Sequence, residues 1–203
     1  MNQTIDESGR DQVPRRPTGV PVLDAESCRP LGHTEADLAF FQTHQPVCGS
    51  PPKDEGASAA LGERITALPK QCWFNARRAV MTLKDWAGAS YVEGWAVCDS
   101  GLWIEHGWLV RDGVTVDPTL PTEVDAYFPG LEFRGRDEIT AFLATPRGKK
   151  CRRSPFLYAY GWGGGYSPTM RKAQADATAY ALARFRDGIF VSPSPPTTVG
   201  GAA

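Results

Sequence analysis

The sequence predicts an α+β protein in which a helix packs on an antiparallel sheet. Apolar residues between positions 71 and 84 recur at helical spacing. Three runs of aromatic and β-branched residues follow at 91–97, 102–110 and 114–119, and turn residues separate them. Runs this close in sequence form consecutive hairpins, so an antiparallel sheet is favoured over a parallel, doubly wound one.

The composition is that of an ordinary globular protein. The chain has 203 residues, of which 41% are hydrophobic and 22% are charged, and its net charge is −1. A nearly neutral chain is a poor candidate for electrostatically driven nucleic-acid binding. No apolar run approaches the roughly 20 residues of a membrane span, and no signal-peptide core is present. We therefore expect neither a membrane nor a nucleic-acid partner, and a cytoplasmic location unless export follows a route without a signal peptide.

The two ends of the chain differ in composition from its centre. Residues 1–18 are polar and contain prolines, and residues 191–203 combine prolines with small residues. We expect both ends to be disordered, which leaves a single domain over residues 19–190. Its first part should contain short helices at 35–41 and 59–68, with a loop at 46–58 between them.

The helix expected at 71–84 would bury one face. Trp73, Ala76 and Val80 recur at spacings of 3 and 4 residues. Pro69 suits a helix entrance because the amide hydrogen that it lacks would have no partner there. Cys72 therefore lies in the first turn. Exposed amides and the helix dipole favour negative charge at that end, so they lower the pKa of a thiol toward the reactive thiolate.

The strands should bring a histidine and an aspartate together. Asp112-Gly113 between two β runs is a strong signal for a two-residue hairpin turn. That turn pairs Val110 with Thr115 and makes His106 and Asp117 diagonal neighbours on one sheet face, roughly 7–8 Å apart at Cα. A carboxylate bonded to one ring nitrogen would leave the other nitrogen to act as a base. A three-residue turn would instead place the two side chains on opposite faces.

Three further residues are candidates for substrate binding: Asn75, Glu93 and Trp108. Asn75 lies on nearly the same side of the helix as Cys72. Glu93 interrupts an apolar strand, either as a solvent-facing position, which is the default, or as a side chain that points into the site. Trp108 suits a buried core and an aromatic binding surface equally well.

The segment after the hairpins should add peripheral elements. We expect a turn and a short strand at 127–133, a helix at 136–144 and a long helix at 169–186. Ser167 and Pro168 suit the start of the long helix. The basic residues at 147–153 suggest a solvated surface or a contact with an acidic partner. The glycine-rich stretch at 158–166 suggests a loop or lid near the mouth of a cleft.

The five cysteines indicate reduced thiols. Their odd number and wide spacing do not fit a disulfide framework. No CxxC or HExxH pattern occurs, so we expect no metal site and no cofactor.

A cysteine at a helix N-terminus, a histidine on a following strand and an aspartate after it resemble the core of the papain-like superfamily, above all its transglutaminase-like branch. The resemblance covers residues 71–119. It implies that Cys72 is the nucleophile, that His106 is the general base and acid, and that Asp117 orients the histidine. Gln71 directly precedes Cys72 instead of lying about a turn upstream, so the backbone amide of Cys72 is the safer oxyanion donor.

The resemblance implies acyl transfer from an amide, ester or thioester through an acyl-enzyme. If water resolves the intermediate, the protein is a peptidase, amidase or deamidase, and if an amine resolves it, a transglutaminase-like acyltransferase. The partner would be a protein, a peptide or a small acyl compound. The alternative is a non-catalytic protein of the same fold, whose aromatic cleft binds a peptide or small molecule and whose cysteine is an unreactive core residue.

Overall fold

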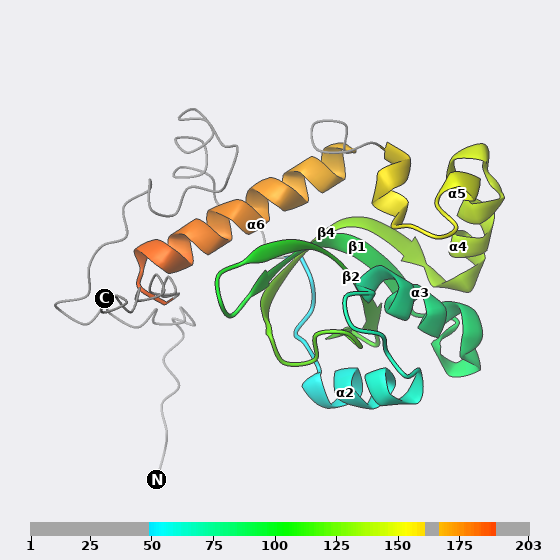
Figure 1. The fold of residues 1–203 in the computed structure, drawn as a ribbon, viewed down its shortest axis with the longest axis horizontal. Helices are drawn as coiled ribbons and strands as arrows, with labels where there is room; N and C mark the ends of the chain where they lie inside the picture. Colours follow the sequence, from blue (N-terminus) through cyan, green and yellow to red (C-terminus); the bar gives the residue numbers. More distant parts are fainter. Residues whose placement is uncertain (1–48, 161–166, 190–203) are drawn as a thin grey trace, which may run out of the picture.

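A four-stranded antiparallel sheet lies at the centre of the fold (Figure 1). The computed structural model describes residues 49–160 and 167–189. The strands are arranged in the order β3-β2-β1-β4, and every neighbouring pair is antiparallel. Their bounds are β1 (Ser90–Cys98), β2 (Trp103–Arg111), β3 (Val114–Val116) and β4 (Val124–Arg134). The predicted α+β class with an antiparallel sheet is confirmed.

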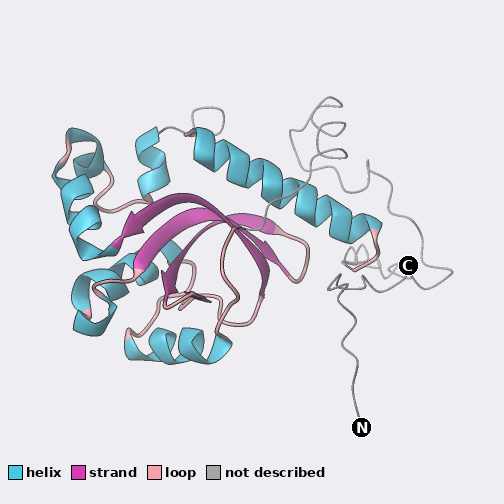
Figure 2. Ribbon diagram, turned by 180° about the vertical axis from the view of Figure 1, so that it is seen from behind, coloured by secondary structure: helices cyan, strands magenta, loops and turns pink. Residues whose placement is uncertain are grey.

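Helices surround this sheet. Figures 1 and 2 show the strands between the long helix α6 and the short helix α2. Helix α6 packs on β4 and β1, α3 packs on β2 and β1, and α2 contacts β3. The helical bounds are α2 (Glu55–Arg64), α3 (Cys72–Thr82), η1 (Lys84–Trp86), α4 (Gly135–Ala144), α5 (Pro146–Lys150), η2 (Phe156–Tyr160) and α6 (Pro168–Arg186).

Helix α3 confirms the helix predicted at 71–84. Its buried face contains Ala76, Ala79 and Val80, which are fully enclosed in the main core with Tyr91 and Leu109 of the sheet. Because alanine and valine are small, the helix axis lies close to the strands. Cys72 is the first residue of the helix, so the predicted position of the thiol in the first turn is also confirmed.

The β2–β3 hairpin has the predicted register. Arg111 pairs with Val114, Val110 with Thr115, and Leu109 with Val116. The two turn residues, Asp112 and Gly113, have φ of 52° and 78°. Positive φ at both central positions matches the twist of the flanking strands and explains the preference for Asp-Gly.

The first described helix starts earlier than predicted. We expected a loop through residue 58 and a helix at 59–68, whereas α2 spans Glu55–Arg64. The side chain of Asp54 caps its N-terminus by accepting a hydrogen bond from the Ala57 amide at 2.8 Å. The cap directly follows the prolines of the loop, and the sequence interpretation gave those prolines too much weight.

Strand β4 is longer than predicted. The expected turn at 127–130 is absent, and a single strand runs through Pro129. The β1–β4 register shifts between Glu93 and Gly94, so that Gly94 pairs with Pro129 while Glu93 pairs with Leu131. Gly130 is the extra residue of this bulge. Proline is tolerated because β4 lies at the edge of the sheet.

Two of the remaining predicted elements are present among the described residues. Helices α4 and α6 confirm the predictions at 136–144 and 169–186, and Ser167 caps α6 through a bond from the Met170 amide. The helix expected at 35–41, the ends at 1–18 and 191–203, and residues 161–166 of the glycine-rich stretch lie outside the described residues. Of the helices in the described ranges, none has both the length and the apolar character needed to cross a membrane.

The bulge opposite Gly94 leaves no room for a side chain. A Cβ atom there would lie 2.2 Å from the Phe128 carbonyl oxygen and 2.9 Å from Cη2 of Trp108. We expect Gly94→Ala to lower the free energy of unfolding by about 1–3 kcal/mol, because strand backbone has to shift. Urea denaturation measures this change. Gly88→Ala is the control, since its Cβ would meet nothing within 4 Å, and equal losses in both variants would contradict the prediction.

Candidate active site

Cys72, His106 and Asp117 come together beside strand β2. Cys72 opens α3, His106 lies in the middle of β2, and Asp117 directly follows β3. His106 Nε2 lies 2.6 Å from Asp117 Oδ2. The two residues are buried, with exposed fractions of 3% and 0%. The contact inferred from the hairpin register is therefore present.

Hydrogen bonds from several segments hold the carboxylate of Asp117. Oδ1 accepts from the amides of Thr119 and Leu120, each at 3.0 Å, and Oδ2 also accepts from the Tyr127 hydroxyl at 2.8 Å. Burial alone would raise the pKa of Asp117, but the charge and hydrogen bond of His106 together with the two amides lower it. The group is thus a stable carboxylate at neutral pH.

Two residues around Asp117 were not found from the sequence. Tyr127 comes from β4, and Ser58 comes from α2, where its hydroxyl accepts the Asp117 amide at 2.9 Å. Neither residue forms a local pattern with Asp117, because each contact depends on how distant elements pack. The only sequence signal was general, an aromatic residue soon after the aspartate.

The imidazole of His106 is enclosed by aromatic rings. It stacks on Trp108, with ring centroids 6.2 Å apart, and lies 6.3 Å from the ring of Tyr127. Its second nitrogen, Nδ1, is buried and has no hydrogen bond of normal geometry within the described segments. Burial lowers the pKa of His106, but the carboxylate of Asp117 and the Cys72 thiol outweigh it and raise the pKa to about 10. The ring is therefore an imidazolium at neutral pH.

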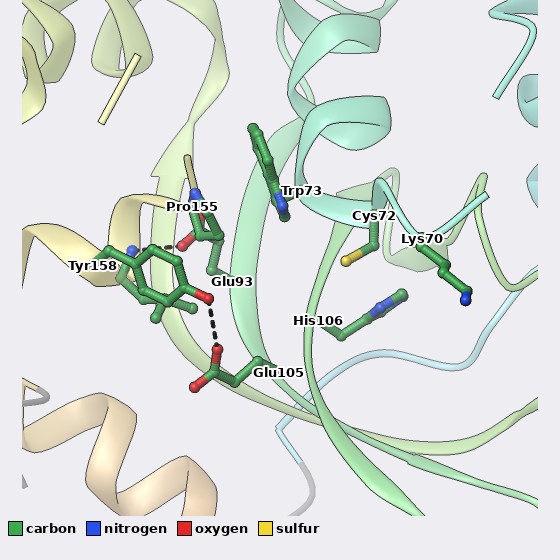
Figure 3. Close-up of a pocket in the computed structure, with 9 residues that line it drawn as sticks. Lys70, Cys72, Trp73, Glu93, Glu105, His106, Pro155 and Tyr158 are labelled. Carbon is green, nitrogen blue, oxygen red and sulfur yellow. Dashed lines mark hydrogen bonds between the residues drawn. The ribbon is translucent and has the colours of Figure 1, made fainter. Parts of the chain in front are cut away.

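The Cys72 side chain lies next to this ring (Figure 3). Burial raises the pKa of the thiol, but the hydrogen bond and charge of His106, with the backbone amides of Gly107 and Trp73, produce a net lowering of the pKa. A thiol with lowered pKa beside a histidine with raised pKa is the electrostatic signature of a thiolate–imidazolium pair.

Gly107 makes the contact between α3 and β2 possible. Strand β3 pairs with β2 only as far as Leu109, so β3 does not cover the outer edge of β2 at His106 and Gly107. A Cβ atom on Gly107 would lie 2.7 Å from Trp73 Cα and 3.0 Å from its nitrogen. The helix N-terminus therefore packs directly on strand backbone, and only glycine permits this approach.

Asn75 and Trp108 do not line the pocket beside Cys72. Asn75 is fully buried and bonds the amide and carbonyl of Leu68 at 3.0 and 2.8 Å and the Thr119 hydroxyl at 3.0 Å. It thus joins the loop before α3 to the loop after Asp117. Trp108 is also fully buried and donates to Ser50 at 3.1 Å. Both residues were predicted to contact substrate. In the structure, their side chains instead bond neighbouring segments of the protein.

A cavity of about 160 Å³ opens beside the thiol (Figure 3). Lys70, Trp73 and His106 border it near Cys72, and the acids Glu93 and Glu105 enter it from the sheet. Its far wall is the segment before and within η2, which contributes Pro155, Leu157 and Tyr158. Tyr158 belongs to the stretch that was expected to lie near the mouth of a cleft.

Glu93 is buried, so the default expectation of a solvent-facing side chain is wrong. Its carboxylate lines the cavity and accepts hydrogen bonds from the Phe156 amide at 2.7 Å, the Leu157 amide at 2.6 Å and the Tyr91 hydroxyl. Burial raises the pKa of Glu93, although these three donors oppose the shift. The alternative expectation, that Glu93 points into the site, describes its position correctly. Its carboxylate is bonded to the amides of the cavity wall.

Arg77 supports the same wall from α3. Its guanidinium donates to the carbonyls of Cys151, Arg152 and Ser154 at 2.9 to 3.3 Å. It also lies 4.7 Å from the ring centroid of Phe156. Together, Arg77 and Glu93 attach residues 151–157 to α3, which carries the thiol, and to the neighbouring strand β1.

Glu105 directly precedes His106 on β2 and is half-buried at the cavity. The Tyr158 hydroxyl donates to Glu105 Oε2 at 3.5 Å (Figure 3). Burial raises the pKa of this carboxyl group, and the Tyr158 hydrogen bond opposes the shift.

In the part of the chain that the structure describes, no group of three or more His, Cys, Asp or Glu side chains has an arrangement that could hold a metal ion.

We expect Gly107→Ala to raise the pKa of Cys72, because the added methyl group moves the start of α3 away from β2 and weakens the interaction with His106. The ultraviolet absorbance of the thiolate, followed against pH and corrected with Cys72→Ser, measures the change. Gly88→Ala is the matched control. A Gly107→Ala protein that folds and keeps the wild-type titration would contradict the role assigned to this glycine.

Asn75→Ala should lower the free energy of unfolding by about 1–3 kcal/mol, because it leaves the amide and carbonyl of Leu68 without partners. Thr119→Val removes a single bond to Asn75 and should cost only about 0.5–1.5 kcal/mol. Thermal or urea unfolding compares the two. An Asn75→Ala protein as stable as the wild type would show that these loops do not depend on the side chain.

Three comparisons with known proteins found no match. No protein-family model, no curated protein and no solved structure matches this chain. The function therefore has to be inferred from the chemistry of the site itself.

Proposed function

We propose that this protein is a thiol-dependent acyl-transfer enzyme with the triad Cys72, His106 and Asp117. One observation carries the proposal. A buried imidazole is bonded to a buried carboxylate through Nε2, while its Nδ1 has no hydrogen bond of normal geometry in the described ranges and the Cys72 thiol interacts with the ring. A core histidine with only a structural role would have both nitrogens satisfied.

The reaction would proceed in two halves. The Cys72 thiolate attacks the acyl carbonyl, and the backbone amide of Cys72 at the start of α3 stabilises the oxyanion. His106 gives its proton to the leaving group, and a thioester forms on Cys72. His106, now neutral, takes a proton from the incoming water or amine, which attacks the thioester and releases the product. Asp117 keeps the imidazole in orientation throughout.

Water as acceptor would make the protein an amide or peptide hydrolase or a deamidase, and an amine would make it an acyltransferase. Both share the first half of the reaction. The chain order of the three residues, on a helix, a strand and the end of the next strand, also supports our proposal of a papain-like or transglutaminase-like core. Cys72, Cys98 and Cys151 are free thiols, which suits our proposal of a reducing, cytoplasmic location.

The pH dependence of iodoacetamide labelling, mapped residue by residue, tests the proposal. The thiolate is the reactive form, so the lowered pKa should keep Cys72 reactive at pH values where an ordinary thiol of pKa about 8.5 is protonated. His106→Ala should move the Cys72 profile to higher pH, because burial remains while the stabilising charge is lost. Cys98 is the internal control, since burial and the neighbouring Asp99 raise its pKa.

An inert Cys72, or one that is indifferent to His106, would reject the enzyme and favour the binding-protein alternative. A reactive Cys72 should also form a thioester with a 4-nitrophenyl ester. Intact-protein mass spectrometry should detect this adduct in the wild type, and the adduct should be lost in Cys72→Ser.

A further inference from the structure

We propose that residues 147–153, the basic segment, bind an acidic stretch of a polypeptide substrate next to the cavity at Cys72. The inference rests on the proposed function, because it names the substrate class of the same site. The substrate would be a polypeptide with several carboxylates close to the acyl group that the thiol attacks, and not a small acyl compound.

The basic segment concentrates positive charge on the surface. It contains no acidic residue, and its five basic side chains are all exposed: Arg147, Lys149, Lys150, Arg152 and Arg153. Among the described residues, none of these five forms an ion pair with a carboxylate. Like charges this close repel one another, and an acidic ligand would relieve the repulsion. The segment is therefore complementary in charge to a run of carboxylates.

The backbone of the basic segment is anchored to the interior. The Arg77 guanidinium of α3 donates to three carbonyl groups between residues 151 and 154, at 2.9 to 3.3 Å. Cys151 is buried in the main core. Charges on a fixed backbone lose less conformational freedom on binding than charges on a flexible tail. This anchoring favours a contact with an acidic partner over a surface that is only solvated.

The basic segment lies next to the cavity. At one end, Arg153 is two residues from Pro155, which lines the cavity, so their Cα atoms are at most about 7 Å apart. At the other end, the Cζ atom of Arg147 lies 4.9 Å from the ring centroid of Tyr160. Tyr160 is the last residue of η2, which forms part of the cavity wall. A ligand bound to the segment therefore reaches the space beside Cys72 through a few residues of extended chain.

The charge of the remaining chain favours a short acidic stretch over a long polyanion. The chain has 22 basic and 23 acidic residues, and five of the basic residues lie in the basic segment. The other residues therefore include 17 basic and 23 acidic side chains, which gives them a net charge of −6 with neutral histidines. A nucleic acid or an anionic membrane would extend beyond the segment and meet this negative remainder. A few carboxylates on a polypeptide would contact the basic segment alone.

Fluorescence anisotropy with labelled heptaglutamate and heptaglutamine, which match the segment in length, tests the binding surface on the full chain. We expect heptaglutamate to bind at low ionic strength and heptaglutamine not to bind. Added salt should weaken the binding, because the charges involved are exposed. The variant Lys149→Gln/Lys150→Gln/Arg153→Gln should bind heptaglutamate roughly tenfold more weakly, because three exposed ion pairs with the ligand are lost.

The matched control removes the same charge at other exposed positions. The variant Lys84→Gln/Arg134→Gln/Arg186→Gln changes η1 and the ends of β4 and α6. It should keep the wild-type affinity within about twofold, because charges outside the contact are screened. Equal affinity of the wild type and the basic-segment variant, or of the two peptides, would overturn the inference. Tighter binding of a single-stranded DNA of equal charge, or of phosphatidylserine vesicles, would also overturn it, because the surface would then suit another class of partner.

Peptide esters separate this inference from the proposed function. Two nitrophenyl esters have an acyl group that ends in four glycines, which span up to about 14 Å, preceded by glutamates in one ester and by glutamines in the other. We expect the glutamate ester to acylate Cys72 several-fold faster than the glutamine ester, because binding to the segment raises its effective concentration at the thiol. The basic-segment variant should lose this advantage and should react with 4-nitrophenyl acetate at the wild-type rate.

The two proposals fail in different ways. If none of the esters acylates Cys72, the enzyme proposal fails, while the anisotropy still decides whether the basic segment binds acidic peptide. If the esters acylate Cys72 without any advantage for glutamate, the substrate class is wrong and the enzyme proposal stands.

Discussion

Asp117, with its buried carboxylate, joins four parts of the chain. It pairs with the imidazole of β2, accepts the Tyr127 hydroxyl from β4 and accepts two amides of its own turn, while its backbone amide donates to Ser58 of α2. His106, Tyr127 and the two amides of the turn each lose a hydrogen-bond partner if the carboxylate is lost. A buried charge is stable only when such hydrogen bonds compensate for the water that it gives up. The positions of the imidazole, of Tyr127 and of the turn after β3 therefore depend on one ionised group.

The second constraint is the close approach of α3 to the edge of β2. A short β3 leaves the edge accessible, and Gly107 removes the side chain that would otherwise separate helix from strand. The backbone amides at this contact and the imidazolium act on the thiol together. The packing of α3 on β2 and the lowered pKa of the thiol thus depend on the same contact. A shift of the helix would loosen this packing and raise the pKa.

The sequence predicted the parts of the fold that local chemistry determines. Asp112-Gly113 sets the turn, the turn sets the register, and the register brings His106 to Asp117, so the pair follows from neighbouring residues alone. The same holds for α3 and α6, whose apolar spacing and caps are local. Each of these predictions needed only one rule applied over a short stretch of chain.

Contacts between distant segments could not be predicted in this way. Glu93 bonds amides at positions 156 and 157, and its environment is set by a segment more than sixty residues away. Tyr127 and Ser58 reach Asp117 only after β4 and α2 have packed. The alternation of side chains along β1 suggested a solvated Glu93, because alternation does not show which segments cover a face of the sheet. The error at β4 has a similar cause, since a proline in an edge strand at a bulge resembles a turn when the partner strand is unknown.

The cavity wall and the reactive pair of thiol and imidazole are held in place by different residues. The segment at 151–157 is tied to the remainder by Glu93 and Arg77, whereas the thiol and imidazole depend on Gly107, Asp117 and the turn after it. Residues 155, 157 and 158 line the cavity and are not among the hydrogen-bond partners of Asp117 described above. Changes to those lining residues would therefore alter which molecules fit while leaving the hydrogen bonds that hold Asp117 intact. A protein built this way can diversify its ligands through one short stretch of chain at little risk to its reactive centre.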